Sequence, residues 1–192
     1  MTKTADEILI EKKADIEHAK QVEEYCIKLF DALSGLNKDF NFSEREKLYL
    51  TEAAKLHDIG YFIDKKSHHK HTLQMITEEG IFGFDERENL IIGNIARYHR
   101  GSEPDEEKHE YYSKLENTDK ILVSKLASIL RIADGLDKPH KNLILRMRAE
   151  IDGNSIKIYL KSIGFKPVLK MAEKKKELFE TVYKKNIDFV IE

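Results

Sequence analysis

The sequence has a single cysteine, Cys26, among its 192 residues. One cysteine cannot form an internal disulfide, and such scarcity is typical of proteins from a reducing compartment. The N-terminus, MTKTADEILIEKK, lacks the apolar core of a signal peptide, and no apolar run in the chain approaches the length of a membrane span. These absences predict a cytoplasmic protein that is not inserted into a membrane.

An excess of charge of one sign is missing as well. Charged residues make up 35% of the chain, but 33 basic and 35 acidic side chains leave a formal net charge of only −2. Proteins that bind nucleic acid usually present a basic surface, so the composition does not favour that class, although a local basic groove is compatible with it. The apolar fraction of 41% is ordinary for a globular protein with a buried core.

Apolar residues at helical spacing dominate the first 140 positions. Capping-box patterns at Thr4–Glu7 and Ser43–Glu46 open two predicted helices, of which the first runs to Gly35 and the second ends near Gly60. Further helices are predicted from about residue 67 to 80, from residue 85, and over TDKILVSKLASILRIADG. None of these windows shows the alternation of a strand.

After Pro139 the apolar period changes from about 3.6 to 2. LILRMRAEI alternates through Leu143, Leu145, Met147 and Ala149, and the segment DGN before SIKIYL predicts a hairpin turn. A charged helix over about 170–184 and a last strand, IDFVIE, complete a ββαβ tail. The predicted fold is therefore mainly α, with a helical domain over 1–140. The small α+β appendage over 141–192 is packed on that domain or continuous with it.

Histidine is concentrated in one place: four of the eight lie between His57 and His71, and Asp58 directly follows the first of them. Three further polar residues, His18, His99 and Asp134, continue the apolar stripes of other predicted helices. For each residue alone, a hydrogen-bonded core position is the ordinary interpretation. Together they are difficult to satisfy with one another when buried, whereas a divalent metal accepts both imidazole nitrogen and carboxylate oxygen. The set predicts a metal site.

The order of a lone histidine, a His-Asp pair and a distant aspartate resembles the HD-domain superfamily of metal-dependent phosphohydrolases. The blocks LHDIGYFI, HHKHT, IARYHRG and LRIADGLDKPH resemble, more closely, the C-terminal HD-like region of the Ppx/GppA exopolyphosphatase family. This similarity runs from about residue 15 to the end. It implies an HD-domain helical bundle with the ββαβ appendage, in a stand-alone form without the two actin-like domains of full-length members.

The resemblance implies a set of metal ligands. The core set is His18, His57, Asp58 and Asp134, with His71 and His99 as second-metal or substrate contacts. The ion would be divalent (Mn, Mg, Fe, Co, Ni or Zn), and would lower the pKa of a bound water to supply the nucleophile. Binuclear relatives have a His-His pair where this chain has His99–Arg100, which favours one tightly held metal.

Catalytic roles are assigned to Asp58, Arg100 and Lys138, the last two as cations that adjoin proposed site residues and could bind phosphate. Other candidate cations are Lys70, Arg97 and Arg131, for which a surface position is the ordinary interpretation. The adjacent His68 and His69 stand at a predicted helix start and are expected to cap it or to lie at the surface. His140 is a further candidate for the pocket lining.

Two function classes remain open. The first is a metal-dependent phosphohydrolase that cleaves a phosphoester or phosphoanhydride of a nucleotide or polyphosphate. The second is a non-catalytic polyphosphate- or nucleotide-binding and oligomerisation module. The resemblance also implies a homodimer, and a separate actin-like phosphatase chain is a candidate partner. The retained ligand residues favour the enzyme, because no Ser-His-Asp pattern, cysteine nucleophile with a partner, or Walker-type loop offers another active site.

Overall fold

The computed structural model describes residues 2–137, 143–163 and 166–192, with only the backbone of 166–168. Lys138 and His140, both candidates for the site, lie outside the described residues. The helices are α1 (Ala5–Glu11), α2 (Ile16–Leu33), α3 (Glu44–Leu56), α4 (His68–Glu79), α5 (Glu86–Arg97), α6 (Glu110–Ser113), α7 (Asn117–Leu136), α8 (Lys166–Lys175) and α9 (Glu177–Tyr183). Two 3-10 turns, η1 (Lys38–Phe40) and η2 (Ile59–Phe62), connect them.

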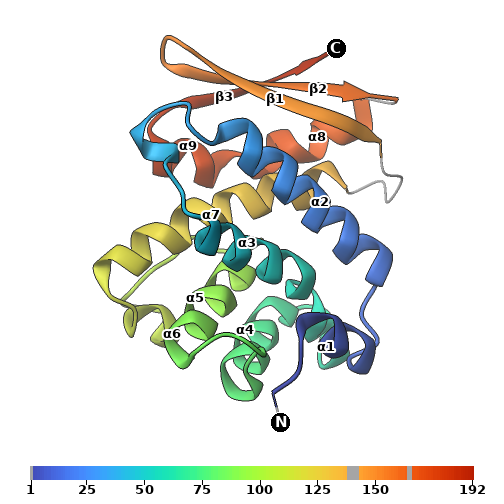
Figure 1. Cartoon of the computed structure of the whole chain (residues 1–192), viewed down its shortest axis with the longest axis vertical. Coiled ribbons are helices and arrows are strands. Elements are labelled where there is room, and N and C mark those ends of the chain that lie inside the picture. Colours follow the sequence, from blue (N-terminus) through green and yellow to red (C-terminus); the bar gives the residue numbers. More distant parts are fainter. Residues whose placement is uncertain (1, 138–142, 164–165) are drawn as a thin grey trace.

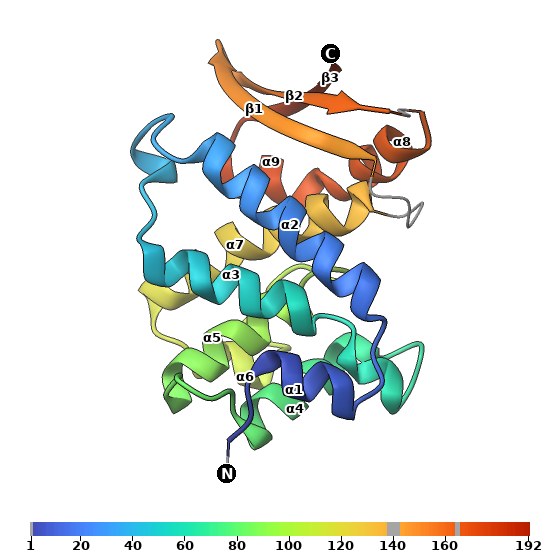
Figure 2. The same ribbon diagram turned by 45° about the vertical axis from the view of Figure 1, so that its right-hand side comes forward.

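The molecule has a helical body with a three-stranded sheet at one end (Figures 1 and 2). The strands are β1 (Ile144–Asp152), β2 (Ser155–Ser162) and β3 (Asn186–Ile191), in the order β1-β2-β3. β1 and β2 form an antiparallel hairpin, whereas β3 pairs in parallel with β2 after the crossover through α8 and α9. The prediction of a mainly α fold with a small α+β appendage is confirmed. Among the described residues, no helix is long and apolar enough to cross a membrane.

Local signals placed most helix starts correctly. Thr4, Ser43 and Asp85 each form a complete capping box at the start of α1, α3 and α5. The single helix predicted up to Gly35 is wrong, because the chain breaks between α1 and α2. Lys13 adopts a left-handed φ of 52°, and the Asp15 side chain then accepts a hydrogen bond from the His18 backbone N–H at 3.0 Å.

The apolar stripes pack as predicted in the body and less regularly in the tail. In α2, the stripe of His18, Val22, Cys26, Leu29 and Leu33 is wholly buried. The alternation predicted for the first strand is wrong at its start, because a register shift between positions 144 and 146 buries Ile144 and leaves Leu145 54% exposed. The helix predicted over 170–184 is divided into α8 and α9 at residue 176.

The tail is closely joined to the helical body. An added Cβ on Gly135 of α7 would lie 3.1 Å from the Cα of Ala172, so α7 and α8 approach almost backbone to backbone. From α2, Tyr25 accepts a hydrogen bond at its hydroxyl from the Ile144 N–H (3.1 Å), and Lys28 donates to the Ile144 carbonyl (2.9 Å). The first of these contacts places α8 beside α7, so that Lys175, the last residue of α8, reaches the candidate site described below.

A charged contact joins α3 to α5, which allows a prediction on pH. Arg45 donates to both oxygens of Glu88 at 2.7 Å, and the Tyr49 hydroxyl donates to the same carboxylate at 2.7 Å. The Arg45 contact lowers the Glu88 pKa from 4.5 to about 2. A depressed carboxyl pKa stabilises the fold above the unfolded value and loses this effect as the pH falls toward 2. Denaturant titrations should show a flatter pH dependence between 4.5 and 2 for Glu88→Gln, and an unchanged slope would contradict the assignment.

Candidate metal centre

Four imidazoles from four different segments converge on the carboxylate of Asp58. His18 comes from α2, His57 follows the last residue of α3, His68 opens α4, and His99 lies just beyond α5. Asp58 Oδ2 is 3.7 Å from His18 Nε2 and 3.4 Å from His57 Nε2. Its Oδ1 is 3.1 Å from His68 Nε2 and 3.4 Å from His99 Nε2. The four rings are buried, and Asp58 is the most accessible member, with a side chain 21% exposed.

The turn after α3 fixes how Asp58 meets α4. Thr72 accepts a hydrogen bond from the Gly60 N–H and donates one to the His57 carbonyl, both at 3.0 Å. Gly60 itself lies so close to α4 that a Cβ there would be 2.0 Å from the His68 carbonyl oxygen. Thr72 and His68 are four residues apart and share one face of α4. This packing turns the His68 side chain toward Asp58.

The ring nitrogens that face away from Asp58 determine the tautomers. Nδ1 lies 2.7 Å from the Ala54 carbonyl in His57, 2.9 Å from the Lys65 carbonyl in His68, and 2.7 Å from the Ala96 carbonyl in His99. A carbonyl only accepts, so each Nδ1 carries the hydrogen, and Nε2 of the neutral ring is a bare acceptor. Burial lowers the pKa of both His57 and His99, which favours this neutral form.

The Nε2 atoms face one another in pairs. His68 Nε2 is 3.2 Å from His99 Nε2, and His57 Nε2 is 3.3 Å from His18 Nε2. The first pair brings two acceptors together, and two acceptors at this distance repel unless a proton or a cation lies between them. A backbone carbonyl or carboxylate behind each ligating imidazole is the usual outer arrangement of protein metal sites. The residues therefore fit divalent metal ions.

The surroundings of His18 are acidic. Burial opposes protonation of this ring, but contacts with Asp134 and Asp137 outweigh burial and raise its pKa to about 9. Asp137 Oδ2 lies 2.7 Å from Nδ1, and Asp134 Oδ1 lies 3.5 Å from Nε2. On the other side of Asp134, Lys175 of α8 donates to Oδ2. The carboxylates around His18 thus favour a positive charge at this ring. A bound metal ion would supply that charge in place of the proton.

The ligand atoms form two groups that share Asp58. Within the described residues, His18, His57 and Asp58 form one group and Asp58, His68 and His99 form the other, with all ligand atoms of a group within 4.8 Å of one another. Asp134 belongs to neither group, although its Oδ1 faces His18. The structure therefore brings together most of the predicted ligands and adds one that was not predicted.

The added candidate ligand is His68, for which the prediction of a capping or surface position was wrong: its side chain is fully buried. Its ring stacks on Tyr61 of η2, with centroids 3.9 Å apart. The prediction that His71 contacts the site is not supported by its position, because His71 is half-buried and outside both groups. Asp137 and Lys175 were not singled out. Asp137 follows Asp134 by one helical turn, which is a weak signal, and nothing distinguishes Lys175 from the other lysines.

The proposed cations lie in different surroundings. Arg100 is exposed. Arg131 is buried, and its guanidinium donates to the carbonyls of Tyr98 (2.6 Å), Gly101 (3.1 Å) and Ser102 (3.0 Å), so it holds the loop after α5. The prediction that Arg131 lies at the surface was therefore wrong. Its guanidinium binds backbone carbonyls rather than the Asp58 cluster.

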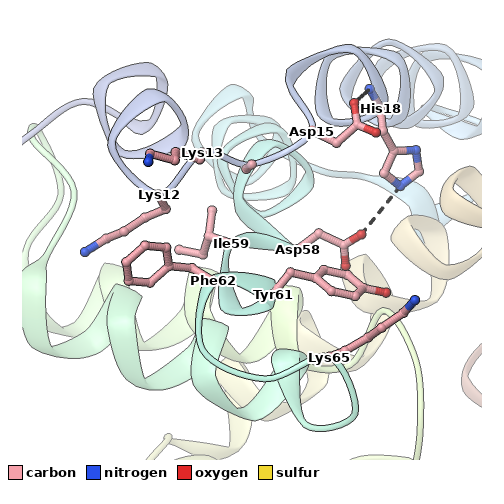
Figure 3. A pocket seen from close by; sticks show the side chains of 10 residues that line it. Lys12, Lys13, Asp15, His18, Asp58, Ile59, Tyr61, Phe62 and Lys65 are labelled. Carbon is pink, nitrogen blue, oxygen red and sulfur yellow. Dashed lines mark hydrogen bonds and ion pairs between the residues drawn. The ribbon is translucent and has the colours of Figure 1, made fainter.

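A cavity of about 460 Å³ opens onto the cluster from solvent. Figure 3 shows Asp58 near its centre, below His18, with Tyr61 and Lys65 on one side and Phe62 and Lys12 on the other. The rest of the lining is Lys13, Ala14, Asp15 and Ile59. Lys12 is paired with Glu79 at 2.7 Å, whereas Lys13 and Lys65 are exposed. The cavity thus joins the accessible edge of the cluster to a rim that contains three lysines.

Comparison with known families agrees with this architecture. A family model described as Ppx/GppA phosphatase, domain III, matches residues 2–175, which span the helical body and most of the tail. The chain belongs to the Ppx/GppA phosphatase family. The family relationship inferred from four short sequence blocks is thereby confirmed.

Two curated Ppx/GppA relatives give the scale of the similarity. Both are named guanosine-5'-triphosphate,3'-diphosphate pyrophosphatase. The protein from Pseudoalteromonas translucida is 31% identical over 84 residues, covering 44% of this chain and 16% of the relative. The protein from Aliivibrio fischeri is 27% identical over 122 residues, covering 62% of this chain and 22% of the relative. This chain therefore corresponds to less than a quarter of either relative's length.

Proposed function

We propose that this chain is an HD-type metal-dependent phosphohydrolase that cleaves a phosphoester or phosphoanhydride. The observation that carries the proposal is the convergence of four buried imidazoles on Asp58, with the Nδ1 atoms of His57, His68 and His99 bound to carbonyls. Such a set needs cations, and among the described residues it lies beside a cavity with a basic rim. The family relationship supports a phosphate-containing substrate.

The ligand groups support two ions rather than the single tightly held ion that Arg100 suggested. His18, His57 and Asp58 would hold one ion, with Asp134 as an additional ligand through Oδ1. Asp58, His68 and His99 would hold the other. Imidazole with carboxylate suits Mn, Fe, Co, Ni or Zn, and Mg is the least suited of the ions predicted.

The mechanism follows from these positions. When bound, a divalent ion supplies Lewis-acid chemistry, in which it activates water and polarises a phosphoryl oxygen. Asp58 is the candidate ligand nearest to solvent, so the carboxylate shared by the two groups lies at the cavity floor, where a substrate would enter. Lys13 and Lys65 are placed on the rim to bind the phosphates of a substrate. Lys175 neutralises one oxygen of Asp134, which leaves the other directed at the cluster.

The names of the two relatives support a guanosine nucleotide as one substrate class. Polyphosphate is the other, suggested by the family relationship. One observation favours the alternative of a non-catalytic binding module: the chain matches only 16–22% of relatives that are themselves named pyrophosphatases. In that case a separate actin-like chain supplies the catalytic residues. For both the hydrolase and the binding module, we propose a homodimer located in the cytoplasm.

Metal counting on matched histidine variants tests the site. Protein purified without added metal should contain close to two divalent ions per chain by inductively coupled plasma mass spectrometry. His68→Ala should lose one ion because it removes a ligand from one group only. His71→Ala, three residues away on α4 and outside both groups, should retain both. Equal metal content in the two variants would contradict the ligand assignment.

Activity is tested on the same preparations with nucleotides, polyphosphate and aryl phosphates. Turnover of at least one substrate should disappear on chelation and return with Mn²⁺ or another suitable ion. If none is hydrolysed while one binds tightly, the binding module replaces the enzyme. The metal count keeps the two questions apart, because a loaded but inactive protein would retain the site and lose only the catalytic role.

A further inference from the structure

A second pocket has a volume of about 400 Å³ and shares no lining residue with the cavity at Asp58. α4 contributes Lys70 and Leu73, and α5 contributes Arg97. The other side is formed by the segment after α5 and by α6. Its lining residues are Ser102, Lys108, His109, Glu110 and Tyr111. The proposed metal ligands do not line this pocket.

Arg97 is the unusual member of the lining. Its side chain belongs to a residue only 7% exposed, and its buried Nε has no hydrogen-bond partner. Within the described parts of the chain, none of the ion pairs involves Arg97. Its guanidinium lies 5.4 Å from the centre of the Tyr98 ring, and a phenol is neutral near pH 7, so this neighbour supplies no counter-charge. A buried charge without a counter-charge is costly, so an anion is missing from its surroundings.

The remaining charges of the pocket do not supply that anion. Lys108 is paired with Asp105 at 2.7 Å, and Glu110 is paired with Lys114 at 2.8 Å, so these two lining residues are each compensated. Lys70 is exposed and, like Arg97, makes no ion pair within the described segments. The pocket thus retains two uncompensated positive charges.

The uncharged groups of the pocket also present donors. The backbone N–H of Asp105 donates to His109 Nδ1 at 3.2 Å, and the Tyr98 hydroxyl lies 2.8 Å from the same atom. Nδ1 is therefore an acceptor, and the hydrogen of the neutral ring is on Nε2. Nε2 lies 3.4 Å from Ser102 Oγ, which leaves the serine hydroxyl able to donate as well. Arg131 fixes this wall by its hydrogen bonds to the carbonyls of Gly101 and Ser102.

We propose that this pocket binds a phosphoryl oxyanion, with Arg97 and Lys70 as the charged contacts and the Ser102 hydroxyl, oriented by His109, as a further donor. A guanidinium fork matches two oxygens of a phosphate, and the serine hydroxyl on the opposite wall offers a donor for another. A carboxylate has only two oxygens and would leave part of this donor set unused. The group can come from free phosphate or from the phosphate chain of a nucleotide or polyphosphate. The site goes beyond the proposed hydrolase centre and requires no metal.

Isothermal titration calorimetry on the full chain tests the proposal, with chelator present to keep metal ions out of the assay. Wild type should bind phosphate or pyrophosphate. Arg97→Gln should weaken the affinity by about tenfold or more, since one charge-assisted hydrogen bond is worth roughly 1.5–3 kcal/mol and 1.4 kcal/mol is tenfold. Arg97→Lys should retain part of the affinity, and Lys70→Gln should lose several-fold. Lys47→Gln is the control, because Lys47 pairs with Asp31 and does not line the pocket; this variant should bind as wild type.

The outcomes are separable. Tighter binding of pyrophosphate or a nucleoside triphosphate than of phosphate would identify a phosphate chain as the source, and equal affinities would identify the free ion. Acetate binding as tightly as phosphate, no binding of any phosphate, or an affinity unchanged in both Arg97→Gln and Lys70→Gln would overturn the proposal. Lys70 is exposed, so its variant keeps the test decisive even if Arg97→Gln does not fold.

Discussion

Asp58→Asn is expected to remove both metal ions and the metal-dependent hydrolysis together. Asp58 is the only residue common to the two ligand groups among the described residues, and its two oxygens face different histidine pairs. Asparagine has nearly the same shape but offers one neutral oxygen in place of two charged ones. Loss of an outer-sphere partner typically costs about 10–100-fold in metal affinity or activity, so loss of this ligand should cost more than 100-fold in kcat/KM.

Metal analysis and kinetics on the same sample would measure this effect. Asp31→Asn is the matched control, because Asp31 is an exposed aspartate that pairs only with Lys47 in the described residues. It should retain both ions and full activity. If Asp58→Asn keeps two ions, the shared-ligand arrangement is wrong. If it loses the ions but still hydrolyses substrate, the hydrolysis does not depend on this centre.

The sequence predicted the parts of the site that depend on local pattern. His18 continues a stripe of apolar residues in α2, so its burial follows from helical spacing alone. The same is true of Asp134 in α7, and the adjacent pair His57–Asp58 is recognisable as a motif. For His18 and Asp134 the face of the helix that carries the residue is determined by its neighbours three and four positions away.

The assignment of His68 failed because its position depends on a contact between segments. At the start of a helix, before any apolar stripe is established, spacing does not decide which of several histidines points inward. The close approach of Gly60 to α4 makes that choice, since it brings the face with His68 and Thr72 against η2. This is a contact between the backbones of two segments, and it cannot be predicted from the composition of either.

Lys175 shows the same limit over a longer distance. It reaches Asp134 because α8 lies close to the backbone of α7, where Gly135 has no side chain and Ala172 has only a methyl group. The periodicity of α8 alone identifies an amphipathic helix but not its partner. The ββαβ tail therefore contributes a charge to the candidate site. We infer that residues 141–192 act as part of one unit with the helical body.

Gly60→Ala is the second variant from which a large effect is expected. The added Cβ would lie 2.0 Å from the His68 carbonyl oxygen, 2.7 Å from the carbonyl carbon and 2.8 Å from the Thr72 nitrogen. All three are backbone atoms, so η2 and the start of α4 must separate. Overpacking of this kind usually costs about 1–3 kcal/mol, and rigid backbone neighbours put this case at or above the upper end. Separation also draws His68 away from Asp58, so we expect one ion to be lost.

Urea denaturation and metal analysis of Gly60→Ala would test both consequences, with Gly35→Ala as the comparison. Gly35 has a left-handed φ of 77° and no atom within 4 Å of an added Cβ. Its substitution introduces only the backbone strain of a side chain in that conformation, about 1–2 kcal/mol, and should leave two ions bound. A Gly60→Ala protein with wild-type stability and two ions would show that the approach of η2 to α4 does not position His68. A large loss of stability with both ions retained would separate the packing constraint from the metal centre.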